Sequence, residues 1–333
     1  MLFVCIAAFL WALEGIALIP PLYSLPVSLV VLLIHGIGFF LLSLSLSKEF
    51  AAAKTFSKKD WTILLLIALL AGALGTLAIV KALFLVNFQK LSVVLLLQKL
   101  QPVFAIVLAL VLLKEKIGKA FYVWAGIAII ASYVMSFGFS LPDFSAASTA
   151  AIFYSLFASL AFASGTVLGR AIAQKYKPTT LTFYRYGLTT IIMLAIVFGT
   201  KAHHHLTIIS PKQWIFLALI PLTTGLGSML LYYRGLNLVK ASVSTIAELM
   251  FPVSAIVLDY LINKTLLSPL QLLSAAVLVF SIIMINKTSK QESSSQQTKT
   301  KEQQKKRKAK KATKIKENKD TIGPASKDNK HNK

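Results

Sequence analysis

KLSVVLLLQKLQPVFAIVL at residues 90–108 and KASVSTIAELMFPVSAIVL at residues 240–258 are two versions of one segment, 150 residues apart. Their polar and proline positions coincide, namely Lys90 with Lys240, Ser92 with Ser242, and Pro102 with Pro252. The same shift pairs Gly15 with Gly165. Apolar runs match easily by chance, so the polar and proline coincidences are what indicate an internal repeat.

The chain around these segments is too apolar for an ordinary water-soluble enzyme. Of its 333 residues 56% are apolar, and its mean hydropathy is +0.72, whereas soluble domains contain about 45–50% apolar residues. A helix needs about 20 apolar residues to cross the hydrocarbon core. Ten stretches meet that length: 2–20, 26–46, 61–86, 91–113, 120–140, 148–169, 179–200, 213–234, 241–262 and 268–286. The sequence therefore predicts an all-α integral membrane protein with ten transmembrane helices.

The ten predicted helices form two halves of five. We expect a first repeat over residues 1–140, a second over 148–286, and a separate tail over 287–333. Because five is odd, the second half enters the membrane from the opposite side. The result is an inverted repeat, an architecture associated with alternating-access transporters.

Positive charge lies mainly on one side of the predicted helices. The chain has 35 Lys and Arg residues against 12 Asp and Glu, and 28 of the 35 fall on the cytoplasmic side if the N-terminus is cytoplasmic. This asymmetry predicts a multi-pass plasma-membrane protein with both termini in the cytoplasm. The first span lacks a charged leader, so we expect it to be retained; a cleaved leader before nine helices is the alternative.

The tail is the most basic part of the chain. Sixteen of the Lys and Arg residues lie in 287–333, which is nearly devoid of apolar residues and is therefore expected to be disordered. Anionic lipid headgroups are the expected partner of a basic tail next to a membrane, and no nucleic acid partner is expected. A solvated tail without a partner is the alternative.

The sequence resembles the EamA-type drug/metabolite transporters, a superfamily of ten-helix proteins built from two five-helix repeats. The motifs behind the resemblance are Trp11-Ala-Leu-Glu14-Gly15, Gln98-x-x-x-Pro102-Val-Phe-Ala leading into Glu115, Arg185, Gly235-Leu236, and Glu248-x-x-x-Pro252. The likeness covers about residues 1–286. It implies a central cavity lined by the first, third, fourth, sixth, eighth and ninth helices. The second repeat departs at Asn263-Lys264-Thr265, which lacks the acid that Glu115 supplies in the first.

Two prolines mark equivalent places in the two repeats. Pro102 and Pro252 each remove the helical hydrogen bond to the carbonyl four residues back, and those carbonyls belong to Gln98 and Glu248. Interruptions of this kind near the membrane midplane mark transporter binding sites. The alternative is that the prolines only bend the helices for packing.

Ionisable side chains at membrane depth are functional candidates because inserting them is costly. We expect Glu14 to carry protons, because a carboxyl group in an apolar medium favours its neutral form; a permanent ion pair with Lys99 or Lys81 is the alternative. We expect Trp11, Gln98, Lys99, Gln101 and Glu248 to bind the substrate.

Several other polar features have simpler interpretations. Lys81 and Arg185 lie near helix ends and can reach the interface, and for Lys81 we expect this rather than substrate binding. We expect Asp259 to be a solvated or capping acid, and Tyr232-Tyr233-Arg234 to form an aromatic belt with a cytoplasmic anchor. His35 aligns with Arg185 in the repeat and is expected to be hydrogen-bonded. His203-His204-His205 has no carboxylate nearby in the sequence, so we predict no metal site. Close helix packing is the expected role of Gly72, Gly75, Gly165, Gly225 and Gly227.

These features predict a secondary transporter, specifically an exporter, of a small polar metabolite or drug-like solute, coupled to protons. It would need no cofactor, since no nucleotide-binding loop is present, and it could form a homodimer. A scaffold acting through its basic tail and an intramembrane lipid enzyme are the alternatives. The enzyme would require convergent catalytic groups, and the sequence shows no such motif.

Overall fold

The computed structural model describes residues 1–85, 91–140, 149–264 and 266–292, and the basic tail from 293 onward lies outside them. The described residues form helices and turns without a strand. The labelled helices are α1 (Leu2–Leu13), α2 (Val27–Ser45), α3 (Lys58–Leu66), α4 (Gly75–Leu85), α5 (Leu91–Gln98), α6 (Gln101–Leu112), α7 (Lys119–Phe137), α8 (Thr149–Ala173), α9 (Pro178–Gly199), α10 (Pro211–Ile220), α11 (Leu226–Leu238), α12 (Ala241–Ala247) and α13 (Met250–Asn263). A further helix runs over Pro269–Glu292.

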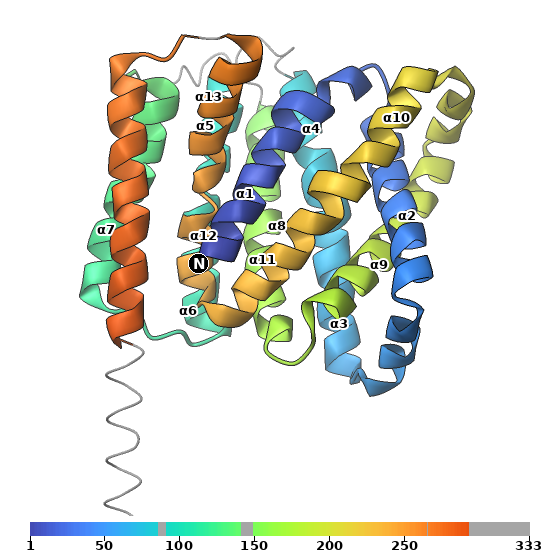
Figure 1. Ribbon diagram of the computed structural model, residues 1–333, viewed down its shortest axis with the longest axis horizontal. Helices are drawn as coiled ribbons and strands as arrows, with labels where there is room; N and C mark the ends of the chain where they lie inside the picture. The colour runs from blue at the N-terminus through green and yellow to red at the C-terminus, as the bar shows by residue number, and fades with distance from the viewer. Residues whose placement is uncertain (86–90, 141–148, 265, 293–333) are drawn as a thin grey trace, which may run out of the picture. The chain divides into compact units, whose positions relative to one another are not determined.

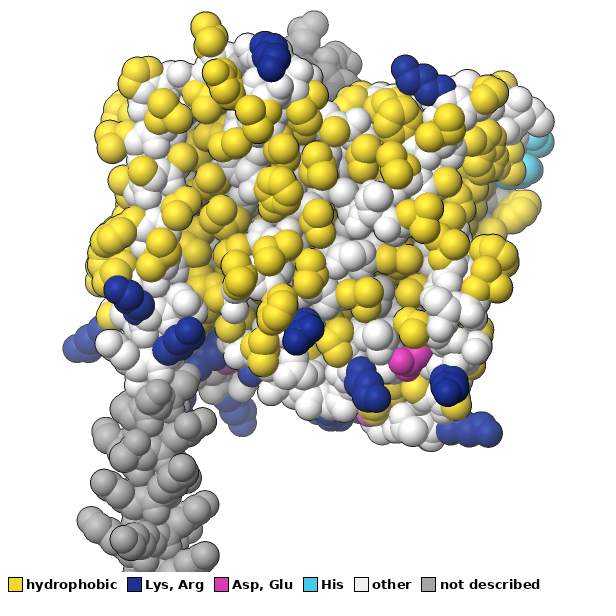
Figure 2. Space-filling view, in the orientation of Figure 1, with side chains coloured by type: hydrophobic (Ala, Val, Ile, Leu, Met, Phe, Trp, Pro, Cys, Tyr) yellow, Lys and Arg dark blue, Asp and Glu magenta, His cyan; other side chains and the backbone are white. Residues whose placement is uncertain are grey.

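These elements join into the ten predicted membrane helices (Figure 1). Within the described residues, nine helical segments are long and apolar enough to cross a membrane, and Leu2–Leu18 is a shorter apolar helix. Large apolar side chains such as Leu44, Val111 and Ile191 are more than 60% exposed, as lipid-facing side chains should be. Figure 2 shows this apolar surface on one face, with most of the Lys and Arg side chains gathered toward its lower edge. The predicted all-α membrane fold is therefore confirmed.

Within residues 1–286, the first helix of each half packs against helices of the other half. Helix α1 packs against α11 and α13, and its counterpart α8 packs against α4 and α6. Helices α2 and α9, which are equivalent to each other, also pack together. Each half thus contributes its first helix to the other half, so the cavity between them is built from both.

Local backbone features repeat in the same way. Capping boxes begin two equivalent helices, with Ser57 and Asp60 at the start of α3 and Ser210 and Gln213 at the start of α10. Such boxes satisfy backbone N–H groups that a helix start leaves without partners. Lys114 and Lys264, which are 150 residues apart, both have a left-handed backbone with φ of 51° and 59°.

One contact between the halves holds the start of α12. The Glu115 carboxylate accepts hydrogen bonds from the N–H groups of Ala241 (2.7 Å) and Ser242 (3.2 Å) and from the Ser242 hydroxyl (2.6 Å). It thereby caps α12, whose own N-cap residue, Lys240, provides no side-chain cap. Lys264 occupies the position equivalent to Lys114, and Asn263 bonds within its own helix to Asp259 at 2.6 Å.

A second network joins α3 to the turn after α8. Lys175 Nζ lies 2.7 Å from Asp60 Oδ1, and the Tyr176 hydroxyl donates to Asp60 Oδ2 at 3.0 Å. The Asp60 carboxylate raises the pKa of the Lys175 ammonium through this hydrogen bond. Lys175 is exposed, so solvent screens the pair and its contribution to stability is small.

Gly165 on α8 is required for close packing against the residue Ala71. A Cβ atom at Gly165 would lie 2.4 Å from the Cβ of Ala71, whereas one at Gly126 would meet nothing within 4 Å. Gly72 and Gly75 are similarly tight, as predicted, but Gly227 has open space around its Cβ position.

We expect Gly165→Ala to destabilise the protein by about 1–3 kcal/mol, the usual cost of overpacking. Gly126→Ala is the matched control and should be neutral or slightly stabilising, because alanine favours helix over glycine. Thermal unfolding of the purified variants in detergent measures both. Equal melting temperatures for Gly165→Ala and the wild type would contradict the close contact.

Candidate functional site

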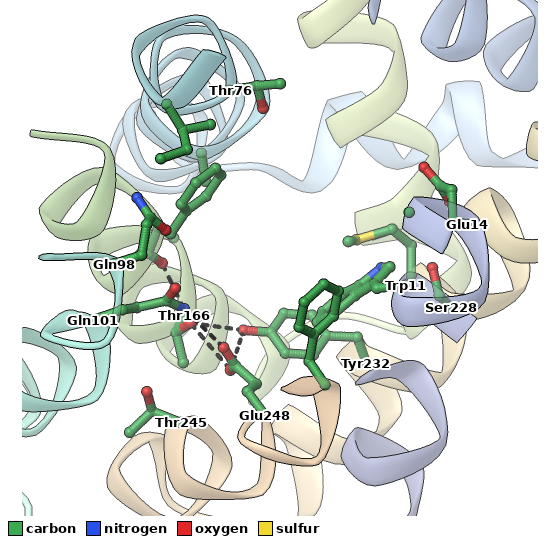
Figure 3. Close-up of a pocket in the computed structure, with 18 of the residues that line it drawn as sticks. Trp11, Glu14, Thr76, Gln98, Gln101, Thr166, Ser228, Tyr232, Thr245 and Glu248 are labelled. Atoms are coloured by element: carbon green, nitrogen blue, oxygen red, sulfur yellow. Dashed lines mark hydrogen bonds between the residues drawn. The ribbon is translucent and has the colours of Figure 1, made fainter. Parts of the chain in front are cut away.

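A cavity of about 590 Å³ lies among the helices of both halves (Figure 3). This volume is in the range of small-molecule sites. All the predicted substrate, proton and helix-break residues line it: Trp11, Glu14, Gln98, Lys99, Gln101, Pro102, Glu248 and Pro252. His35 and Arg185 line it too, so the second and seventh helices join the six that the resemblance implied.

Interrupted helices bring the polar groups to this cavity. Helix α5 ends at Gln98 and α6 begins at Gln101, while α12 ends at Ala247 and α13 begins at Met250. Pro102 and Pro252 stand in the first turns of α6 and α13, where a missing N–H costs little. The predicted helix breaks therefore occur at equivalent places, and each faces the cavity.

Glu248 is at the centre of a hydrogen-bond network from three helices (Figure 3). Its carboxylate accepts from Gln101 Nε2 at 3.0 Å, the Tyr232 hydroxyl at 3.0 Å and the Thr166 hydroxyl at 3.3 Å. The Tyr232 hydroxyl also lies 2.8 Å from Thr166 Oγ1. Neutral donors thus hold this acid without an ion pair, which fixes the side chains around it.

Tyr232 corrects one prediction from the sequence. It is only 4% exposed, and its neighbour Tyr233 is fully buried, so these residues do not form an aromatic belt. Helix α11 continues to Leu238, beyond the predicted end at 234, which places Tyr232 inside the protein. Its ring meets the edge of Trp11 at a centroid distance of 5.1 Å.

Glu14 lies on the opposite side of this aromatic pair from Glu248 (Figure 3). Its carboxylate accepts a hydrogen bond from the Thr224 hydroxyl at 2.8 Å. No ion pair joins it to Lys99 or Lys81 among the described residues, so the alternative of a permanent pair is wrong. Lys81 is exposed, as a snorkelling lysine should be.

Arg185 corrects a second prediction. Its side chain is 9% exposed and lines the cavity, so it does not reach the membrane interface. It lies on the inward face of α9, which begins at Pro178 and packs against α2. His35, its repeat partner, hydrogen-bonds to the Val31 carbonyl at 2.9 Å and packs on Tyr186.

Sequence analysis missed Thr166, Thr224 and Tyr232, which hold the two cavity acids. Threonines are common in membrane helices, so the presence of a threonine does not by itself indicate a functional role. Their role appears only when the helices are packed. The Asp259 carboxylate accepts a hydrogen bond from the Asn263 side chain one turn later in α13, and Asp259 does not line the cavity. The residues that the structure describes contain no His, Cys, Asp and Glu cluster suited to a metal.

Comparison with known proteins agrees with this architecture. A model of the EamA-like transporter family matches residues 1–137 and 149–287. The riboflavin transporter ImpX of Fusobacterium nucleatum is 45% identical over 289 residues, which cover 86% of this chain and 97% of that protein. An uncharacterized transporter of Synechocystis, sll1164, is 26% identical over 68% of this chain and 67% of its own. One solved crystal structure shares the fold, with a TM-score of 0.65 and 13% identity over 87% of this chain and 98% of that one.

Proposed function

Because this chain belongs to the EamA-like transporter family, we propose that the metabolite it carries across the membrane is riboflavin or a close flavin relative. The observation that carries this proposal is the 45% identity to a riboflavin transporter over 97% of that protein's length. Substrates can change within a family because they depend on the site rather than the fold, so the cavity must also suit a flavin.

The cavity has both kinds of surface that a flavin needs. Four aromatic rings line it and offer flat apolar surface to a planar ring system, those of Trp11, Phe162, Tyr232 and Phe251. The amides of Gln98 and Gln101 offer donors and acceptors to ring carbonyls or a hydroxylated chain. The Gln98 amide donates only a long bond, 3.5 Å, to the Ser155 carbonyl, so it is available to a ligand.

Alternating access would use the interrupted helices. The half-helices α5–α6 and α12–α13 each carry cavity residues at their breaks, and rocking of one half against the other would expose these breaks to each side in turn. A carrier of this kind runs in either direction according to the gradients. Export, the predicted direction, is measured by loading the solute inside vesicles and following its efflux.

Uptake of radiolabelled riboflavin into proteoliposomes tests the proposal. We expect saturable uptake that excess unlabelled riboflavin blocks and that protein-free vesicles lack. Folded, reconstituted protein that neither binds nor moves riboflavin would contradict it.

Glu14 is the proposed proton carrier. It is the cavity acid with a single hydrogen-bond donor among the described residues, Thr224, so its other oxygen can take up a proton while the Thr224 bond stays. We expect Glu14→Gln to abolish the stimulation of riboflavin transport by an imposed pH gradient, while exchange of labelled for unlabelled riboflavin continues.

Asp259→Asn is the matched control for this variant, because Asp259 bonds within its own helix and does not line the cavity. It should keep the pH-gradient response of the wild type. An unchanged response in Glu14→Gln would remove that residue from proton coupling.

A further inference from the structure

The cavity contains a cation that the protein does not neutralise. Lys99 stands in the break between α5 and α6 and lines the cavity. It is partly buried, and its ammonium group makes no hydrogen bond or ion pair with any residue that the structure describes. An ammonium group at membrane depth is costly without a partner, so a ligand that supplies negative charge would stabilise this one.

Arg185 is a second cation of the same cavity. Its side chain is 9% exposed, and its Nε atom has no hydrogen-bond partner. No carboxylate oxygen of the described residues lies within 4.0 Å of its guanidinium group. A guanidinium group that lines the cavity without a carboxylate partner is a second positive charge for an anionic ligand to meet.

The two acids of the cavity do not supply that acceptor. Glu248 already accepts from three neutral donors, and Glu14 from Thr224. Lys99 and Arg185 are therefore two positive charges of this cavity that its acids leave without a carboxylate partner among the described residues.

We propose that the cavity takes flavins bearing an anionic group, such as a phosphate ester, as well as neutral riboflavin, and that Lys99 and Arg185 receive the charge. This inference rests on the proposed flavin function and extends its substrate range. Lysine and arginine are the side chains that most often bind phosphate. The ring system would lie along the aromatic wall, as in riboflavin binding, so one cavity would serve both ligands.

Competition against radiolabelled riboflavin, with the purified full-length protein in detergent, tests the proposal. The probe is riboflavin 5′-phosphate. We expect it to displace riboflavin from the wild type with an affinity within about tenfold of riboflavin's own. Lys99→Met should weaken phosphate-ester binding by about tenfold more than it weakens riboflavin binding, the usual effect of losing a hydrogen bond between charged groups.

Lys81→Met is the matched control, since it removes the same side chain from an exposed position outside the cavity. It should change neither affinity. The salt dependence of binding is a second measurement, and it needs no variant. Raising the ionic strength should weaken binding of the phosphate ester more than binding of riboflavin, because salt screens charges.

Three results separate the claims. Wild-type protein that binds riboflavin but not its phosphate ester would overturn this inference and leave the proposed function standing. Equal loss of both ligands in Lys99→Met, with no difference in salt dependence, would also overturn it. Binding of radiolabelled riboflavin 5′-phosphate, measured directly, without binding of riboflavin would support the anion site and overturn the proposal of riboflavin itself.

Discussion

Glu248→Gln should weaken riboflavin binding by about tenfold to a hundredfold. The carboxylate accepts three hydrogen bonds, from Gln101, Thr166 and Tyr232, and a glutamine amide has one oxygen in place of two. The glutamine NH2 group would face either Gln101 Nε2 or the two hydroxyls, so the side chains of this cavity wall must rearrange. Losing one such bond costs about 1–3 kcal/mol, and the rearranged wall would fit riboflavin less well. Competition binding with labelled riboflavin measures the loss.

A double variant shows whether the lost hydrogen bonds cause the effect. Tyr232→Phe removes one donor while keeping the ring against Trp11. Combined with Glu248→Gln, it should cost less than the sum of the two single changes, because both changes act on the same hydrogen bond. Riboflavin affinity within twofold of wild type in Glu248→Gln would show that the network lies outside the binding site.

Glu115→Ala should lower the free energy of unfolding by about 2–3 kcal/mol. The change removes three hydrogen bonds to the start of α12, all to a charged acceptor, and such bonds are stronger than neutral ones. For a chain of 333 residues each kcal/mol corresponds to about 1.4 °C, so the melting temperature should fall by roughly 3–4 °C. Thermal unfolding in detergent measures it.

Ser242→Ala is the comparison for this variant. It removes one of the three donors, the Ser242 hydroxyl, and leaves both backbone bonds to Glu115, so its effect should be well under half as large. A Glu115→Ala protein that melts within about one degree of wild type would show that the contact contributes nothing to holding α12.

The sequence alone was sufficient for most of the fold because its signals are local. Ten apolar stretches, the transporter family and the non-enzymatic function are all confirmed. The breaks beside Pro102 and Pro252 follow from proline's missing N–H. Four features stay predictions, namely the domain boundaries at 140, 148 and 286, the cytoplasmic termini, the homodimer and lipid binding by the tail.

The partners of the site residues depend on packing, and the sequence does not encode packing directly. Polar residues at membrane depth were good candidates, because the bilayer excludes those that have no inward partner. The predicted positions of Tyr232 and Arg185 were wrong because a short distance from the end of a helix was taken to mean that the side chain is exposed. Which face of α9 and α11 turns inward depends on neighbouring helices, which a single span does not reveal.

Three of the membrane helices contain a π-helical segment, in which the turns are wider than in an α-helix. Glu14–Leu18, Ile67–Leu74 and Pro221–Gly225 are π-helical, and each contributes residues to the cavity. A π-turn accommodates an extra residue within an α-helix. Deleting one residue from Ile67–Leu74 would restore an α-helical turn and shift the side chains within it, including Ala71 and Gly72 of the cavity wall. Because the wide turn absorbs one residue, α3 and α4 would keep their relative rotation and Asp60 would stay opposite Lys175. Each π-helical segment therefore sets which side chains face the cavity without turning the rest of its helix.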